Sequence, residues 1–232
     1  MPNSDSNFLR TIILLSVCFA FSGTTSSLTV SASSIVGYEI AGNKALATLP
    51  IAFHLIGTML AGIPASLLMK RVGRRYGFMI GTGIGAIGAA AATFSIIYSN
   101  FVLFCISIFC LGILSGFTQL YRFTAADVAS QEFRTKAVSL VMFGGILAGF
   151  IGPAVASKAK DLIADAPFAG SYLFVILFHV LIVAILFMIR LPLPSLEEQT
   201  GESRPYKEIF SQPKFIVAVL TSMIGYGVMA MI

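Results

Sequence analysis

Hydrophobic residues in this chain fall into long blocks that short polar or charged links separate. A helix needs about 20 apolar residues to cross a hydrocarbon layer roughly 30 Å thick. Blocks of about this length cover residues 8–33, 46–69, 76–98, 101–129, 137–157 and 171–189. A further block occupies residues 214–232 and stops at the last residue of the sequence. The pattern predicts an all-α fold, a polytopic transmembrane helix bundle, with a polar linker over residues 190–213.

Local signals refine three of these elements. Residues 22–34 are rich in Ser and Thr, whose hydroxyls can bond to the preceding turn, so we expect a helix that faces the bundle rather than lipid. Pro64 is expected to interrupt the second span. Residues 99–100 leave room only for a tight turn. A cleaved signal peptide is disfavoured for residues 1–25, because Asp5 offsets Arg10 and no suitable cleavage site follows.

Lys and Arg gather on one side of the predicted bundle. The amino-terminal segment and the links after the second, fourth and sixth spans carry Arg10, Lys70, Arg71, Arg74, Arg75, Arg134, Lys136, Arg190, Arg204, Lys207 and Lys214. The opposite links carry only Lys44, Lys158 and Lys160. The positive-inside rule then predicts a cytoplasmic amino terminus and an integral protein of the cell (inner) membrane.

Composition excludes several classes of function. The chain is 57% hydrophobic and 11% charged, whereas a soluble protein carries about 25% charged residues. The net charge is +5, and the basic residues lie at the ends of the spans, so we expect contact with the lipid bilayer and no nucleic-acid partner. Cys18, Cys105 and Cys110 lie inside apolar blocks and are interpreted as buried small side chains. We find no phosphate loop, nucleophile motif or metal-ligand cluster, and expect no enzyme, no metal and no cofactor.

Small residues recur every fourth position in two spans. This spacing places them on one helical face, where helix backbones can approach closely. The third span has Gly77, Gly81 and Gly85, followed by Ala89 and Thr93. The fifth span has Gly144, Ala148 and Gly152, with Gly145, Gly149 and Pro153 beside them. The stripes are compatible with static packing and with faces that slide during a conformational cycle.

The link between the second and third spans carries the most specific motif. Residues 66–75 read S-L-L-M-K-R-V-G-R-R. This resembles the G-x-L-x-D-R-x-G-R-R link of major facilitator superfamily transporters, with matches at Leu68, Arg71, Gly73, Arg74 and Arg75. The chain departs from the motif at Ser66, where the family has glycine, and at Lys70, where it has aspartate.

Two further segments are similar to the same family. Family members often carry an acid near the end of the fourth span and then P-x-x-x-R-x-x-A; here Asp127 is followed by Arg134 and Ala137, without the proline. Gly152-Pro153 is similar to the G-x-x-x-G-P of proton-driven drug exporters, with Ala148 in place of the first glycine. The resemblance covers essentially the whole chain.

The resemblance implies an amino-terminal six-helix bundle (residues 1–189) and the start of a seventh helix. Family members pair two such bundles and bind a small-molecule solute between them. We therefore expect a secondary active transporter that works by alternating access, as an antiporter or a symporter, with its carboxy-terminal six-helix half missing from this chain. The alternative is a truncated or non-transporting member that acts as a membrane receptor or assembly partner.

The resemblance also implies a conformational latch, meaning a set of polar contacts that holds one state of the transporter. In the family, the arginine of the basic link pairs with the acid low in the fourth span. The corresponding pair here is Arg74 and Asp127. The remaining latch candidates are Arg71, Gly73, Arg75 and Arg134. The alternative is that each charge simply faces the cytoplasm.

Arg122 is the candidate for solute binding. It lies about seven residues before the predicted cytoplasmic end of the fourth span, a depth of roughly 10 Å at 1.5 Å per residue. An ionisable residue at that depth is a functional-site hypothesis by default. Ser115, Thr118 and Gln119 share its arc of the helix and complete a polar stripe suited to an anionic or hydrogen-bonding solute. A snorkelling arginine is the alternative.

The sequence leaves the coupling ion open. If protons drive transport, the titrating group is Asp127, Glu39, one of the histidines His54 and His179, or a residue of the missing half. Each histidine lies alone in an apolar block, which is more typical of a hydrogen-bonded core residue than of a proton carrier.

Overall fold

The computed structural model describes residues 2–189, 191 and 211–231, and all regular secondary structure in these residues is helical. The first compact unit is Met1–Pro194, and the second is Ser195–Ile232. The first unit contains α1 (Pro2–Ile40), the short 3-10 helix η1 (Lys44–Leu46), α2 (Leu49–Val72), α3 (Arg74–Ile97), α4 (Phe101–Thr118), α5 (Tyr121–Val128), α6 (Arg134–Ala159) and α7 (Ala169–Met188). Within its described residues the second unit contains α10 (Pro213–Met231). Most of the predicted linker 190–213 lies outside the described residues.

Six segments of the described chain are long and apolar enough to cross a membrane. They are Phe8–Ile40, Lys44–Val72, Arg74–Ile97, Phe101–Val128, Arg134–Ala159 and Ala169–Met188. The predicted fold class, an all-α polytopic bundle, is confirmed. The Ser/Thr-rich half is helical, as expected, and α1 continues beyond it to Ile40, so the first span is longer than predicted.

Hydroxyl groups explain how that half of α1 remains a helix. Thr24 Oγ1 donates to the Ala20 carbonyl at 2.8 Å, and Thr29 Oγ1 donates to the Thr25 carbonyl at 2.8 Å. Both threonines are fully buried against other helices. Back-bonding of this kind satisfies polar side chains inside an apolar bundle.

Pro64 does not interrupt the second span, so that expectation was wrong. Helix α2 continues through Pro64 to Val72. Pro64 itself is exposed, whereas Ala61 and Ala65 on either side of it are buried against the bundle. Packing of these flanking turns holds the helix together although the proline lacks an amide hydrogen.

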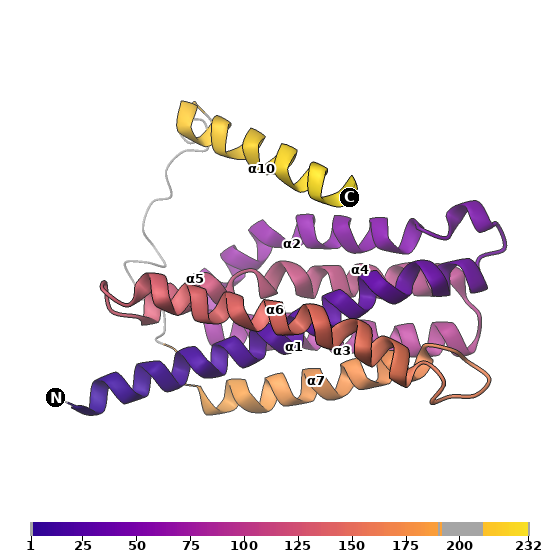
Figure 1. The fold of residues 1–232 in the computed structure, drawn as a ribbon, viewed down its shortest axis with the longest axis horizontal. Coiled ribbons are helices and arrows are strands. Elements are labelled where there is room, and N and C mark those ends of the chain that lie inside the picture. Colours follow the sequence, from indigo (N-terminus) through magenta and orange to yellow (C-terminus); the bar gives the residue numbers. More distant parts are fainter. Residues whose placement is uncertain (1, 190, 192–210, 232) are drawn as a thin grey trace. The chain divides into compact units, whose positions relative to one another are not determined.

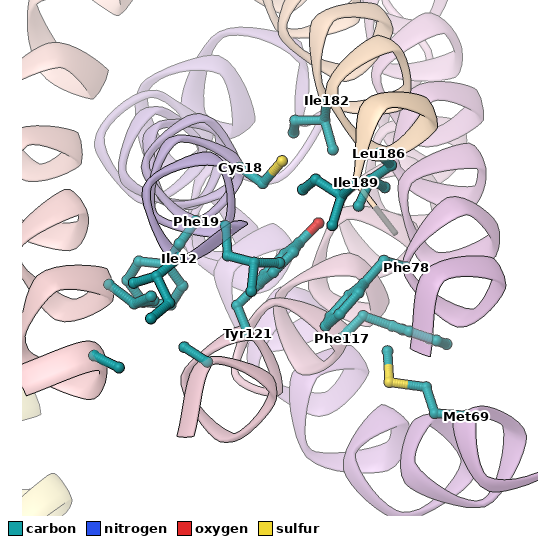
Figure 2. Close-up of a cluster of buried hydrophobic side chains, with 14 of the residues drawn as sticks. Ile12, Cys18, Phe19, Met69, Phe78, Phe117, Tyr121, Ile182, Leu186 and Ile189 are labelled. Atoms are coloured by element: carbon teal, nitrogen blue, oxygen red, sulfur yellow. The ribbon is translucent and has the colours of Figure 1, made fainter. Parts of the chain in front are cut away.

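Contacts between helices that are distant in sequence build the bundle. Helix α1 packs along α6, α2 packs along α4, and α3 packs against α4 and α7 (Figure 1). One core cluster gathers around Tyr121, whose ring stacks on Phe78 with 3.9 Å between the ring centroids. Figure 2 shows Tyr121 between Phe78 and Cys18 in this cluster. A second cluster surrounds Phe104 and Tyr172, whose rings meet edge to face.

The backbones of α2 and α4 approach very closely. A Cβ on Gly112 would lie 2.2 Å from the His54 carbonyl oxygen, and a Cβ on Gly57 would lie 2.4 Å from the Phe109 carbonyl oxygen. Because the helices are so close, Thr58 Oγ1 of α2 can donate a hydrogen bond to the Gly112 carbonyl of α4 at 3.1 Å. Only glycine fits such reciprocal backbone contacts.

The predicted basic links lie at one end of the bundle. The amino terminus, the α5–α6 link and the end of α7 share an end of the unit, whereas the α6–α7 loop and η1 lie at the other (Figure 1). The 99–100 turn is tight, as expected: Ser99 has a φ of 50°, and the Asn100 side chain caps α4 by accepting from the Leu103 amide at 3.0 Å.

Candidate functional site

The basic link is a sharp reversal centred on Gly73. This residue has a φ of 88° and separates the last residue of α2 from the first residue of α3. Its amide donates to the Met69 carbonyl at 2.9 Å, and its carbonyl accepts from the Gly77 amide at 3.0 Å. Glycine alone adopts this positive φ without steric cost, so Gly73 determines the positions of Arg74 and Arg75 at the start of α3.

Arg74 joins the start of α3 to α5. Its Nη2 donates to Asp127 Oδ2 in an ion pair, and its Nη1 donates to Thr124 Oγ1 at 2.9 Å. Thr124 is fully buried, whereas about half of the Asp127 side chain is exposed. The guanidinium therefore reaches from a partly solvated carboxylate to a buried hydroxyl. The structure brings the predicted pair together.

The other predicted latch residues make separate contacts. Arg75 donates from Nη2 to the Phe187 carbonyl at 3.2 Å and lies over the Phe187 ring, at the end of α7. Arg134 Nε donates to the Ala126 carbonyl at 3.1 Å and links α6 to the last turn of α5. Arg71 is exposed at the end of α2. The link thus contacts α5 through Arg74 and α7 through Arg75.

A polar cluster that the sequence did not reveal lies in the middle of the spans. Ser115 Oγ of α4 is 2.6 Å from Ser26 Oγ of α1 and 3.4 Å from His54 Nε2 of α2. His54 is only 4% exposed and lies against the Ile108 backbone of α4, and its buried Nδ1 makes no hydrogen bond of normal geometry within the described part of the chain. Ser22, one turn before Ser26 on α1, has a buried Oγ that also lacks a partner there.

This cluster has hydrogen-bonding capacity left over. A neutral imidazole carries one donor and one acceptor, so His54 can bond a further group through Nδ1. A polar atom without a partner is costly in an apolar bundle, which makes such a position a functional candidate. The serines and the histidine come from three separate spans, which explains why spacing along the sequence did not predict the cluster.

The predicted solute-binding residues do not form one contiguous stripe. Helix α4 ends at Thr118 and α5 begins at Tyr121, so a break separates Ser115 and Thr118 from Arg122. Thr118 is buried and donates to its own helix at the Leu114 carbonyl, whereas Gln119 is exposed. Arg122 is half-buried, with its guanidinium over the Phe123 ring and a buried Nε that lacks a partner within the described residues.

The small-residue stripes face neighbouring helices at most of the predicted positions. In α3, a Cβ on Gly77 would meet Met69 at 2.4 Å, and a Cβ on Gly81 would meet Phe117 at 2.6 Å. A Cβ on Gly85 would meet both His179 and Leu114 at 2.6 Å. In α6, a Cβ on Gly145 would meet the Phe19 ring at 2.9 Å, and one on Gly152 would meet Ser27 at 2.6 Å. Gly149 differs, because a Cβ there would meet nothing within 4 Å, and Pro153 is exposed within α6.

The remaining titratable candidates occupy different environments. His179 of α7 is buried, with Nδ1 2.5 Å from the Val175 carbonyl oxygen. Glu39 is exposed at the end of α1 opposite to the basic links. No group of three or more His, Cys, Asp or Glu side chains suited to a metal ion occurs among residues 2–189, 191 and 211–231.

Six membrane-length helices among the described residues, joined by a basic glycine turn and an ion pair between spans, define a polytopic membrane protein. The sequence profile of the Major Facilitator Superfamily matches residues 14–232, and the chain belongs to this superfamily. The predicted family is therefore confirmed.

Relatives and solved structures agree with this assignment. The chain is 33% identical over 227 residues to the riboflavin transporter RfnT of Brucella anthropi, covering 96% of this chain and 56% of that protein. It is 29% identical over 205 residues to the uncharacterized transporter YdeG of Bacillus subtilis, covering 85% of this chain and 47% of YdeG. The E. coli fucose:proton symporter FucP has the same fold, with a TM-score of 0.63 at 16% identity over 93% of this chain and 56% of FucP. The chain spans about half the length of the curated relatives that it matches.

Proposed function

We propose that the complete protein is a secondary transporter that moves a small organic solute across the membrane by alternating access. The observation that supports this proposal is the contact at the basic link, where Arg74 of one span donates hydrogen bonds to Asp127 and Thr124 of another. Opposite charges that are partly exposed can break and re-form as helices move, which suits a contact present in only one state. The described bundle supplies one half of the transporter.

Riboflavin is the first solute to test, since the chain is 33% identical over nearly its whole length to a riboflavin transporter. The complete protein, expressed in a bacterium that cannot synthesise riboflavin, should restore growth at low external riboflavin. Vector-only cells are the control. Absence of growth despite protein in the membrane fraction would remove riboflavin from the proposal.

The proposed orientation places the amino terminus and the basic links in the cytoplasm of a bacterial inner membrane. It rests on the shared end of the bundle to which these links map and on the positive-inside rule. Single cysteines introduced at Ser130 and at Asp161 test it. A membrane-impermeant thiol reagent applied to intact cells should label only the second position; the reverse pattern would contradict the orientation.

Arg122 remains the proposed contact for an anionic or hydrogen-bonding part of the solute. Its partnerless Nε and half-buried guanidinium leave donors free for a ligand. Arg122→Ala should weaken solute binding by at least roughly tenfold, because a hydrogen bond to a charged group contributes about 1.5–3 kcal/mol. Binding by the purified complete protein measures this effect. Arg122→Lys, which keeps the charge, should lose less; unchanged binding in the alanine variant would exclude the role.

His54 is our candidate for the proton-coupling group. It lies in mid-bundle beside the Ser115 hydroxyl, which in turn contacts Ser26, whereas Asp127 and Glu39 are exposed near the two ends. His54→Gln keeps hydrogen-bonding atoms but removes titration. We expect this variant to lose pH-gradient-driven accumulation in proteoliposomes while it retains solute exchange at equal pH on both sides.

The matched control for this test is His179→Gln, which alters a second buried histidine in the same unit. His179 Nδ1 contacts the Val175 carbonyl of its own helix, whereas His54 Nε2 contacts the Ser115 hydroxyl of another span, so we expect replacement of His179 to leave the pH response intact. Accumulation by the His54 variant at the wild-type level would exclude His54 as the coupling group.

A further inference from the structure

An apolar cavity of about 520 Å³ lies between α6 and α7, near the loop that connects them. Its walls include Phe150 and Ala154 from α6, Leu162 from the loop and Phe174 from α7. Ligand pockets in proteins typically measure about 300–1,000 Å³, so this cavity is large enough for a substantial apolar group. Helices α6 and α7 are both membrane-spanning segments, and the cavity therefore lies where lipid chains are available.

Lys158 is the charged residue in the wall of this cavity. It belongs to the last turn of α6, at the edge of the span, and its side chain is exposed. The neighbouring Lys160 lies 3.9 Å from the Asp161 carboxylate. No acidic partner for Lys158 occurs among the described residues, so the cavity combines apolar walls with an uncompensated cation at its rim.

We propose that the cavity holds an acyl chain of a phospholipid whose anionic headgroup binds Lys158. The apolar walls match the chain, and the ammonium at the membrane edge matches the phosphate at headgroup level. A helix of the second half seated over the cavity would bury Lys158, which is costly unless that helix supplies an acid. The observed charge therefore favours a lipid over a protein occupant. The proposal does not depend on the solute or on transport.

Native mass spectrometry of the complete protein, released from nanodiscs of mixed phosphatidylglycerol and phosphatidylcholine, tests the proposal. Wild-type protein should retain phosphatidylglycerol preferentially. Lys158→Ala should reduce that retention roughly fivefold, as expected for removal of a single interfacial lysine. Ala154→Phe, which fills the cavity, should reduce retention of both lipids without removing a charge.

Lys160→Ala is the matched control, because it removes an equal charge only two residues from Lys158, and Lys160 already has an acidic neighbour in Asp161. It should retain phosphatidylglycerol as the wild type does. Equal losses in the two lysine variants would indicate general surface attraction and overturn the proposal. Absence of retained phosphatidylglycerol in the wild type would also overturn it.

Discussion

Replacing Gly112 by valine should leave little folded protein in the membrane. A Cβ at this position would lie 2.2 Å from the His54 carbonyl oxygen, and this neighbour is helix backbone that cannot rotate away. Overpacking of a well-packed core costs roughly 1–3 kcal/mol, and we expect the upper end or more here because two helices must separate. The measurement is the yield of monodisperse complete protein and its midpoint of thermal unfolding in detergent.

Gly83→Val is the matched control for this prediction. Gly83 lies in the middle of α3, and a Cβ there would meet nothing within 4 Å. Both variants introduce the same β-branched side chain into a helix, so the helix-propensity cost is the same. Comparable yields of the two variants would contradict the close approach of α2 and α4.

Exchanging the charges of the Arg74–Asp127 pair gives the second large effect. Arg74→Asp and Asp127→Arg should each lower the transport rate about tenfold, as expected when a charge-assisted hydrogen bond of about 1.5 kcal/mol is lost and like charges face each other. The double variant should recover part of this loss. Recovery should be incomplete, because the exchanged arginine would no longer reach Thr124 from α3.

A double-mutant cycle on the initial rate of transport by the complete protein measures the coupling between the two positions. Arg71→Asp is the control, since Arg71 is an exposed arginine of the same link. Its combination with Asp127→Arg should show no recovery. Purely additive effects of Arg74→Asp and Asp127→Arg would mean that the observed ion pair does not contribute to the transport cycle.

Much of the fold follows from the sequence because a bilayer imposes a simple rule. Backbone polar groups must be satisfied inside the hydrocarbon layer, so a long apolar block has little choice but a helix. Two details were misjudged. The first span continues past its predicted end at residue 33 to Ile40. The missing amide of Pro64 suggested a break, but packing of the flanking turns keeps α2 continuous.

Helix pairing was harder to predict than helix positions. The stripes in the third and fifth spans drew attention, yet a very close backbone approach joins α2 to α4. A signal for it exists in Gly57-x-x-x-Ala61 and Gly112-x-x-x-Gly116, whose spacing is typical of close helix contacts. The spacing of small residues shows that one face of a helix carries small side chains, but it does not identify the helix that packs against this face.

The candidate site was also predictable only in part. The Arg74–Asp127 contact was predictable only from the resemblance of the basic link to a known family, since the two residues lie far apart in sequence. The cluster of Ser26, His54 and Ser115 had no such guide, because Ser115 was predicted as part of a stripe on its own helix and the other two residues lie on different spans. The break after Thr118 likewise separated residues that a continuous helix would have aligned with Arg122.

The most direct test of the account is riboflavin counterflow by the complete protein in sealed liposomes. Liposomes are loaded with unlabelled riboflavin and diluted into labelled riboflavin, without ATP and without an ion gradient. We predict transient accumulation of label above that in protein-free liposomes, and slower accumulation with the Arg74→Asp variant. Label entry equal to that of protein-free liposomes would contradict the proposal that this bundle belongs to a riboflavin carrier working by alternating access.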